Sequence, residues 1–438
     1  MNLPEEPWRL SASELANLDQ THIWHPFTQM ADWCADSHEP LVLAKGKGAR
    51  VTDLAGLEYI DGNSSIWTNI HGHNHPTITA AIRDQLDRMA HSSFLGLTHP
   101  NAAVLARELV ARAPGDSLTK VFFSDNGSTA NEVSLRMSLQ ARALRGETQR
   151  TQFVAFDQAY HGDTVGAANL SGIPLFSAPV AAPFPPVTRV ANLEELVSLG
   201  SDFAETVNAV IIEPLVQGPA AIRPWPKGML RGLADWCEEH GVFLILDEVL
   251  TGFGRTGTLF ACEQENVVPD FLNLAKGITG GYLPLAVTLT TQTVFDAFLG
   301  GADKTFYYGH SYTANAVGCA AALASLQVFD DEDVLANLQP KIAELTTGLA
   351  NLSALPQISE IRQCGFMAAL EVQGMTPTAI EMENRNQLGA AVCNAARDFG
   401  LLTRPVRNAV VLMLPLCATS EEISAACAAI GQGIAQVC

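Results

Sequence analysis

Short apolar segments recur along the chain from about residue 120, and segments with helical spacing separate most of them. The continuous apolar runs that predict strands buried on both faces lie at residues 121–123, 153–156, 207–215, 242–246, 271–274 and 285–289. Helical spacing follows the first run through Ala130, Val133 and Met137. This alternation is typical of a mainly parallel α/β sheet with helices on both faces.

The two ends of the chain have a different pattern from the middle. Residues 1–40 are irregular and rich in Trp, His and Pro, residues 41–61 predict short strands, and residues 76–91 and 100–113 predict helices. A Pro-rich stretch at 174–187 predicts a surface loop. We expect a large domain over residues 76–325 and a smaller α+β domain over 326–438. The segment 1–75 is expected to pack with the small domain.

Composition narrows the class of protein. The 438 residues carry 26 Lys and Arg against 46 Asp and Glu, a formal charge of −20, which disfavours nucleic acid and anionic membranes as partners. The nine cysteines form no C-x-x-C pair, which favours reduced thiols. No apolar run reaches the ~18 residues that span a bilayer, and Met1–Glu6 does not resemble a signal peptide. We therefore expect a cytoplasmic protein without membrane partners.

Two chemically active residues stand at the ends of neighbouring apolar runs. Asp247 follows the run 242–246, and Lys276 follows the run 271–274 after one alanine. Ligands of open α/β sheets bind beyond the carboxyl ends of the strands, so both side chains can face one ligand. Taken singly, Asp247 could cap a turn and Lys276 could extend into solvent. Together they match pyridoxal phosphate (PLP), which needs a lysine amine for its aldehyde and a carboxylate for its pyridine nitrogen.

Two further segments supply groups that a bound PLP would need. Gly127 and Ser128 follow a strand and open a helix, where free N–H groups and the helix dipole favour a phosphate. An ordinary N-cap loop has the same pattern. Tyr160 follows the run 153–156 and could stack on the pyridine ring. A surface turn closed by Gly162 is the alternative.

Two patterns point to chemistry that we reject. Residues 252–257 spell G-x-G-x-x-G, but Asp247 and Glu248 intervene after the strand and no strong helix follows, so a dinucleotide site is not expected. His71, His73 and His75 alternate, but no Cys or acidic residue is near them in sequence. We interpret them as loop histidines and expect no metal.

Four motifs in a fixed order resemble the signature of the class III aminotransferases. They are Asp247-Glu248-Val249, Thr251-Gly252-Phe253-Gly254-Arg255-Thr256-Gly257, Pro269-Asp270 and Ala275-Lys276-Gly277. The resemblance covers nearly the whole chain. It implies PLP as cofactor and the α/β PLP-transferase fold type I, with a mainly parallel sheet in a large domain and a smaller α+β domain.

Other motifs are similar to a narrower group, the 7,8-diaminononanoate synthases of biotin biosynthesis. They begin at His22 (His-Ile-Trp-His-Pro-Phe-Thr-Gln-Met), Ser64 (Ser-Ser-Ile-Trp), His71 (His-Gly-His-Asn-His-Pro), Tyr160 (Tyr-His-Gly-Asp-Thr), Glu213 (Glu-Pro-Leu-Val-Gln-Gly) and Leu402 (Leu-Thr-Arg-Pro). These enzymes aminate 8-amino-7-oxononanoate (KAPA) to 7,8-diaminononanoate. The resemblance implies a PLP aminotransferase that performs this step.

The resemblance also implies a role for each matching residue. Lys276 would bind PLP covalently and carry protons, Asp247 would pair with the pyridine nitrogen, and Tyr160 would stack on the ring. The cofactor-binding set would comprise Gly127, Ser128, Tyr160, His161, Glu213, Asp247, Lys276, His310 and Ser311. The substrate-binding set would comprise Phe27, Trp67, Tyr160, Gly309 and Arg404, with Arg404 anchoring the substrate carboxylate. The stretch at Gly309–Ser311 would reach the neighbouring subunit's phosphate, which implies a homodimer with shared active sites.

Three departures from the narrower group concern the amino donor. Many members that use S-adenosylmethionine have Tyr, Trp and Tyr where this chain has Phe27, Ile66 and Val411. The three replacements together resemble the variants that use lysine. The donor implied is therefore S-adenosylmethionine or lysine, with the departures favouring lysine.

Three alternative functions stay open at this stage. Another class III transaminase would act on an ω-amino acid or a diamine, and a substrate panel would identify it. A PLP aminomutase would turn over without an external donor. A regulator with the PLP fold would bind its ligand without turnover, but it would need a DNA-binding module that this acidic chain lacks.

Overall fold

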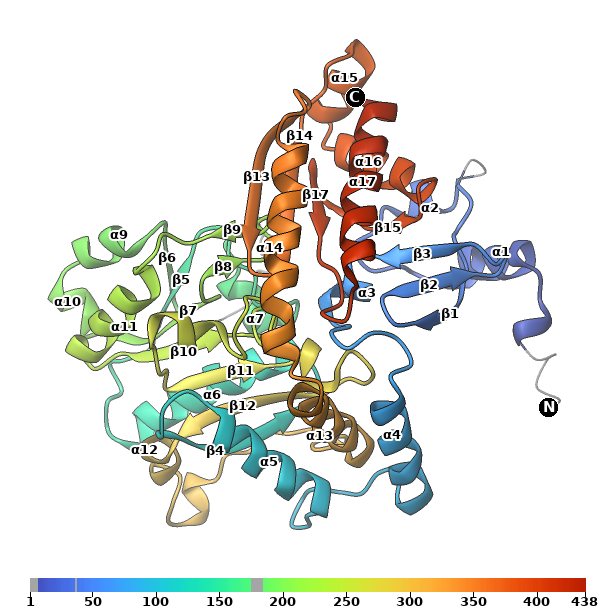
Figure 1. Cartoon of the computed structure of the whole chain (residues 1–438). Coiled ribbons are helices and arrows are strands. Elements are labelled where there is room, and N and C mark those ends of the chain that lie inside the picture. The colour runs from blue at the N-terminus through green and yellow to red at the C-terminus, as the bar shows by residue number, and fades with distance from the viewer. Residues whose placement is uncertain (1–6, 36–37, 175–183) are drawn as a thin grey trace.

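A computed structural model describes residues 7–35, 38–174 and 184–438. A seven-stranded sheet forms the centre of the larger part of the molecule (Figure 1). A four-stranded sheet near the C-terminus and another near the N-terminus lie on one side of it (Figure 1). Several cofactor residues predicted from the sequence end or closely follow strands of the seven-stranded sheet, whereas Phe27, Trp67 and Arg404 lie outside it.

The seven-stranded sheet has the order β4-β12-β11-β10-β7-β5-β6. Its strands are β4 (Leu118–Ser124), β5 (Gln152–Phe156), β6 (Val187–Val190), β7 (Val207–Ile212), β10 (Phe243–Asp247), β11 (Phe271–Leu274) and β12 (Ala286–Thr291). Strand β12 pairs antiparallel with both neighbours, and the other pairings are parallel. The mainly parallel α/β sheet expected from the apolar runs is confirmed.

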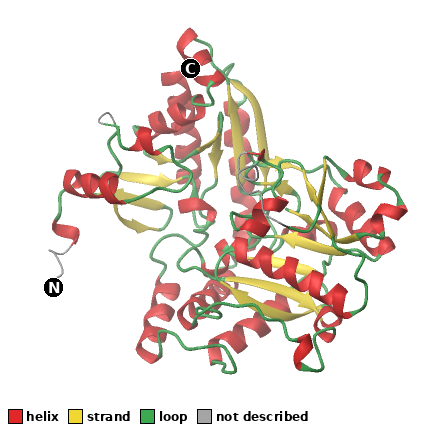
Figure 2. Cartoon of the chain, turned by 180° about the vertical axis from the view of Figure 1, so that it is seen from behind, coloured by secondary structure: helices red, strands yellow, loops and turns green. Residues whose placement is uncertain are grey.

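The central strands are apolar at nearly every position because helices cover both faces of the sheet (Figure 2). Successive residues of β7 show this, because Val210 and Ile212 join one core cluster while Ala209 and Ile211 join another. The first cluster includes residues of α5 (Pro100–Arg112), α11 (Met229–His240) and α13 (Ala316–Asp331). The second includes residues of α6 (Gly127–Leu144) and α12 (Gln292–Asp296).

The C-terminal sheet has the order β13-β14-β17-β16 and packs with long helices (Figure 1). Its strands are β13 (Ile358–Cys364), β14 (Met367–Val372), β16 (Pro405–Val406) and β17 (Ala409–Leu412). The helices of this region are α14 (Val334–Leu352), α15 (Pro377–Asn384), α16 (Leu388–Arg397) and α17 (Ser420–Val437).

The N-terminal sheet joins the two ends of the chain. Strands β1 (Leu43–Lys47), β2 (Arg50–Asp53) and β3 (Glu58–Asp61) form a meander, and β15 (Leu401–Leu402) pairs parallel with β3. The division into domains stays a prediction, and helix α13 runs through its expected boundary at residue 325.

The remaining elements are short, or lie at the edges of these sheets. They are the helices α1 (Ala12–His22), α2 (Met30–Trp33), α3 (Ser64–Trp67), α4 (Pro76–Arg88), α7 (Val165–Leu170), α9 (Leu193–Ser198) and α10 (Ser201–Ala204), the 3₁₀ turns η1 (Pro7–Arg9), η2 (Ala261–Glu265), η3 (Lys276–Thr279) and η4 (Ala302–Lys304), and the strands β8 (Val216–Gln217) and β9 (Arg223–Pro224). The loop expected at 174–187 lies mostly outside the described residues, and its last residue begins the edge strand β6.

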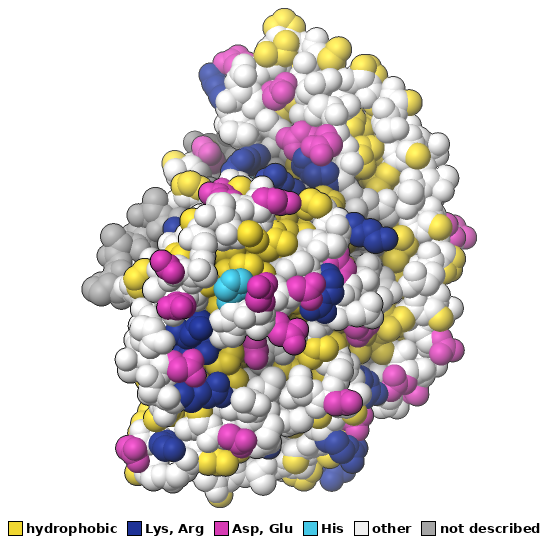
Figure 3. Space-filling model, turned by 90° about the vertical axis from the view of Figure 1, so that its left-hand side faces the viewer, with side chains coloured by type: hydrophobic (Ala, Val, Ile, Leu, Met, Phe, Trp, Pro, Cys, Tyr) yellow, Lys and Arg dark blue, Asp and Glu magenta, His cyan; other side chains and the backbone are white. Residues whose placement is uncertain are grey.

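The surface and the helices bear on possible partners. On the face drawn in Figure 3, acidic and basic side chains are interspersed, with apolar side chains between them. Within the described part of the chain, no helix has both the length and the apolar character that crossing a bilayer requires.

Candidate active site

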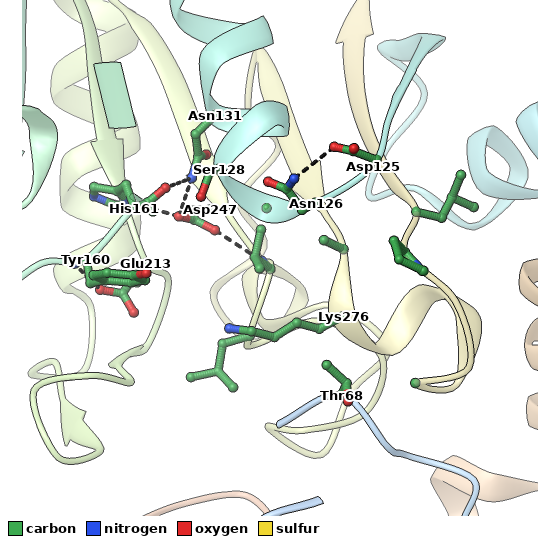
Figure 4. Close-up of a pocket in the computed structure, with 18 of the residues that line it drawn as sticks. Thr68, Asp125, Asn126, Ser128, Asn131, Tyr160, His161, Glu213, Asp247 and Lys276 are labelled. Atoms are coloured by element: carbon green, nitrogen blue, oxygen red, sulfur yellow. Dashed lines mark hydrogen bonds and ion pairs between the residues drawn. The ribbon is translucent and has the colours of Figure 1, made fainter. Parts of the chain in front are cut away.

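A cavity of about 460 Å³ lies at the carboxyl ends of the central strands. Its volume falls in the range of small-molecule sites, roughly 300–1,000 Å³. Figure 4 shows side chains from several strands pointing into it. The residues predicted from the sequence that line it are Gly127, Ser128, Tyr160, His161, Glu213, Asp247 and Lys276. The structure thus brings together residues that lie 149 positions apart in the sequence (276 − 127).

Asp247 ends strand β10, and three donors bind its carboxyl group. Its Oδ2 accepts hydrogen bonds from His161 Nδ1 at 2.8 Å and from Asn131 Nδ2 at 2.8 Å, and its Oδ1 accepts one from the Val249 N–H at 3.2 Å (Figure 4). Hydrogen bonds of this kind stabilise the charged carboxylate. A buried carboxyl group of fixed orientation therefore faces the cavity, in the place where a ring nitrogen would need a partner.

Asn131 is a site residue that sequence reasoning missed. Its amide donates to Asp247 and to the His161 carbonyl, and its Oδ1 accepts from Asn273 Nδ2 at 2.7 Å. Asn273 lies opposite Asp247 in the register of β10 and β11, and also donates to Ser134 Oγ at 2.9 Å. All these groups are buried, so the network fixes the orientation of the Asp247 carboxylate.

Lys276 follows strand β11 in a strained conformation. Its φ of 42° is in the left-handed region that residues with a side chain rarely adopt. The side chain extends into the cavity (Figure 4), where burial lowers the pKa of the amine, while Asp247 and Glu213 oppose this shift by attraction. A lowered pKa increases the fraction of neutral amine, the form that attacks a carbonyl or accepts a proton.

Glu213 follows strand β7 and organises one wall of the cavity. Its Oε1 accepts the Tyr160 N–H at 3.1 Å and its Oε2 accepts the Gly218 N–H at 3.0 Å. Burial raises the pKa of Glu213 to about 7; among the other influences, attraction to His161 lowers it and repulsion from Asp247 raises it. Glu213 therefore changes its charge near neutral pH.

This shift predicts a pH-dependent stability. Between the ordinary glutamate pKa of 4.5 and the folded value of about 7, the unfolded chain releases a proton that the folded chain keeps. The free energy of unfolding should therefore fall as pH rises through this window, by about 1.4 kcal/mol per unit of pKa shift. In Glu213→Gln the cofactor-free protein should lose less thermal stability between about pH 5 and about pH 7.5 than the wild type. An equal loss in both proteins would contradict the shift.

The N-terminus of helix α6 forms a second wall. Asn126 caps the helix by accepting the Thr129 N–H at 3.0 Å, and the N–H groups of Gly127 and Ser128 precede the first intrahelical bond. A Cβ atom on Gly127 would lie 2.6 Å from a Val249 methyl, so only glycine fits there. Such a helix start, with its positive dipole end, suits a phosphate group.

Tyr160 lies on the opposite side, from the loop after β5. Its hydroxyl donates to Asp163 Oδ2 at 2.6 Å. Burial raises the pKa of the phenol most, and the bond to Asp163 raises it further. The Asp163 N–H in turn donates to Ser128 Oγ at 3.1 Å. Asp163, which sequence reasoning also missed, therefore joins the ring of Tyr160 to the start of helix α6.

Of the predicted substrate residues, Tyr160 lines the cavity, whereas Phe27, Trp67, Gly309 and Arg404 are not among its lining residues. The ring of Trp67 is 5.1 Å from Lys276 Nζ, and His310 Nε2 is 3.9 Å from Asp125 Oδ1 near the start of helix α6. Phe27 and Arg404 are exposed. Gly309 and Ser311 are in the same loop as His310. Their assigned roles remain predictions.

The two patterns that we rejected have structural roles. His71, His73 and His75 bond separately to Ser325, Asp61 and Glu332. Across residues 7–35, 38–174 and 184–438, no three His, Cys, Asp or Glu side chains gather as metal ligands would. The glycine-rich segment 252–257 forms turns rather than a helix start, with Phe253, Gly254 and Gly257 at positive φ.

Comparisons with known proteins agree with this geometry. The class III aminotransferase family profile matches residues 33–434. An adenosylmethionine-8-amino-7-oxononanoate aminotransferase of Nitratidesulfovibrio vulgaris is 47% identical over 434 residues, which cover 94% of this chain and 80% of the relative. A Geobacter sulfurreducens relative of the same name is 42% identical over 431 residues, covering 93% of this chain and 94% of the relative.

Solved structures show the same fold. The crystal structure of the adenosylmethionine-8-amino-7-oxononanoate aminotransferase of Methanocaldococcus jannaschii matches with a TM-score of 0.91 and 38% identity over 98% of this chain and 100% of that chain. A PLP-bound amine transaminase from an uncultivated Pseudomonas species matches with a TM-score of 0.87 and 30% identity over 95% and 99%. Fold type I is thereby confirmed. The chain therefore belongs to the class III aminotransferases, a family of PLP-dependent enzymes, and the signature residues Asp247 and Lys276 line its cavity.

Proposed function

We propose that the cavity binds PLP through the residues that face it. The observation that carries this proposal is the placement of the Lys276 amine and the Asp247 carboxylate in one cavity, with the helix α6 N-terminus on its wall. Lys276 would hold the aldehyde end, Asp247 the pyridine nitrogen, and Gly127 with Ser128 the phosphate. When bound, PLP supplies a ring that takes up electrons from the carbon that loses a proton in transamination.

The chain's own residues supply the proton transfers and the positioning. Burial lowers the pKa of Lys276 Nζ, which increases the fraction of neutral amine that can accept a proton from one carbon and return it to another. His161 and Asn131 hold the Asp247 carboxyl group in one orientation, while Tyr160 is fixed by its bond to Asp163. The site is thus organised before any ligand binds.

We further propose that the amino acceptor is KAPA and the product 7,8-diaminononanoate. Support comes from the relatives named for this reaction, which align with 93–94% of the chain. Arg404 is an exposed cation whose side chain has no hydrogen bond or ion pair with a described residue, so a substrate carboxylate can bind it. The donor is S-adenosylmethionine, for which these relatives are named, or lysine. Of the two we propose lysine, because Phe27, Ile66 and Val411 stand where many similar enzymes that use S-adenosylmethionine have Tyr, Trp and Tyr.

A substrate panel tests this function. The purified enzyme with PLP should aminate KAPA when lysine is supplied, and faster than with S-adenosylmethionine. An analogue of KAPA without its carboxylate should have a KM higher by about 10–100-fold, because a charge-assisted pair with Arg404 contributes about 1.5–3 kcal/mol. Turnover of ω-amino acids or diamines without turnover of KAPA would identify the other class III activity. Turnover without any donor would identify an aminomutase.

We also propose a cytoplasmic homodimer with shared active sites. Large apolar side chains are exposed at Trp24, Leu95, Tyr307 and Tyr312, with exposed fractions of 86%, 83%, 74% and 63%. Tyr307 and Tyr312 flank the loop at His310, which the resemblance places against the neighbouring subunit, so a partner would cover their exposed rings. All nine cysteines are free thiols, which fits a reducing compartment. A solution mass of twice the chain mass would support the dimer, and a monomeric mass would contradict it.

A further inference from the structure

The turn that carries Trp67 has an unusual backbone. Ser64, Ser65 and Trp67 all have positive φ, at 45°, 62° and 66°, although each has a side chain. Ser65 combines its φ with a ψ of −83°, a strained γ-turn geometry. Backbone of this kind persists only where the surrounding structure determines it. The contacts that hold this turn therefore decide where the Trp67 ring lies.

Polar side chains fix the turn from both sides. The Asp61 carboxylate accepts the Ser65 N–H, with both oxygens at 2.8 Å, and is itself bonded to His73 Nε2 at 2.9 Å. On the other side, Ser64 Oγ donates to the Met413 carbonyl at 2.7 Å. Asp61 is 2% exposed, so these charged contacts are shielded from water and the turn is fixed at both ends.

Asn63 makes the direct connection to the tryptophan. Its Oδ1 accepts the Trp67 indole N–H at 2.9 Å, and its Nδ2 donates to the Ser65 carbonyl at 3.1 Å. One buried amide thus binds both the strained backbone and the side chain that the turn presents. The ring so held lies 5.1 Å from Lys276 Nζ and packs with the cluster that includes Leu250.

We propose that Asn63, supported by the Asp61–His73 pair, is a positioning residue that sets the substrate pocket by orienting Trp67 beside Lys276. The inference rests on the proposed function in that Trp67 borders the substrate. Asn63 itself does not contact the cavity, so its effect passes through the Trp67 N–H. A residue that acts in this way changes the fit of the substrate more than the chemical step.

A double-mutant cycle tests this route. In Asn63→Ala the KM for the keto substrate should rise about fivefold with kcat within about twofold, as one lost hydrogen bond of ordinary strength allows. Trp67→Phe keeps an aromatic ring but removes the indole N–H together with the pyrrole half of the ring, so a change in KM of at least about fivefold is expected. If Asn63 acts through that N–H, the double variant should be no worse than the poorer single variant. Multiplying effects, about 25-fold in KM, would overturn the proposal.

A matched control and a second readout separate positioning from stability. Asn208 is equally buried but donates to Ser138 in the large sheet region, so Asn208→Ala should lower the thermal midpoint without changing KM. The decrease of tryptophan fluorescence when PLP binds can be measured without substrate. The share of this decrease that is absent in Trp67→Phe is the contribution of Trp67. This contribution of Trp67 should be smaller in Asn63→Ala and unchanged in Asn208→Ala. If the fluorescence decrease in both variants equals that of the wild type, Asn63 does not position Trp67. This result would overturn the proposal even if the enzyme binds PLP and transaminates as proposed.

Discussion

Lys276→Ala is expected to reduce transamination by at least about 10⁴-fold, at the upper end of the range for loss of a general base. The variant loses the amine in the cavity whose pKa burial lowers, and no other described lysine lines that cavity. PLP should still bind through the helix α6 N-terminus and Asp247, but more weakly. Single-turnover formation of pyridoxamine phosphate measures the effect, because it follows the first half-reaction directly.

Lys341→Ala provides the matched control for this prediction. Burial also lowers the pKa of Lys341, but its amine donates to the Leu416 carbonyl at 2.8 Å, away from the cavity. This variant should lose some thermal stability and keep its turnover within about twofold. A Lys276→Ala enzyme that keeps comparable turnover would exclude Lys276 from proton transfer.

Asp247→Asn is expected to reduce turnover by about 10²–10³-fold, the usual effect of removing one preorganised electrostatic contact. The amide is neutral, so His161 and Asn131 lose the charged acceptor that they share and a protonated ring nitrogen loses its counter-charge. Removing the Asp247 charge should also lower the pKa of Lys276 further, because attraction to Asp247 raises it. The measurement is kcat with saturating PLP, together with the pH dependence of the half-reaction.

Glu248→Gln controls for the loss of a buried carboxylate. Glu248 is adjacent in sequence but accepts the N–H groups of Ala261 and Cys262 at 2.7 and 2.9 Å, outside the cavity. This variant should lose stability while its pH profile stays that of the wild type. Equal losses of turnover in Asp247→Asn and Glu248→Gln would mean that Asp247 has only a structural role.

The sequence predicted the central sheet well because strands buried on both faces are continuously apolar. The runs before Asp247 and Lys276 correspond to β10 and β11, which pair in parallel, so the strand-end rule correctly placed both side chains in one cavity. The edge strand β6 was missed because it is short and follows a Pro-rich stretch. An edge strand contributes little apolar pattern of its own.

The residues that the sequence did not reveal depend on contacts between distant segments. Asn131 is a helical residue within α6, and only the fold brings it to Asp247, 116 positions away. The left-handed backbone at Ser64 and Ser65 is stabilised by side-chain bonds from Asp61 and Asn63 and contains no glycine at these two positions. The sequence therefore gives no sign of it. Asp163 could have been proposed from its position three residues after Tyr160, although that spacing alone names no partner.

The most direct test of the site is to locate where the cofactor is attached. Wild-type enzyme reconstituted with PLP should be reduced with borohydride, digested and mapped by mass spectrometry. We expect one pyridoxyl-labelled peptide, the one containing Lys276, and no label in Lys276→Ala. A label on another lysine such as Lys341, or no label in protein that has bound PLP, would contradict it.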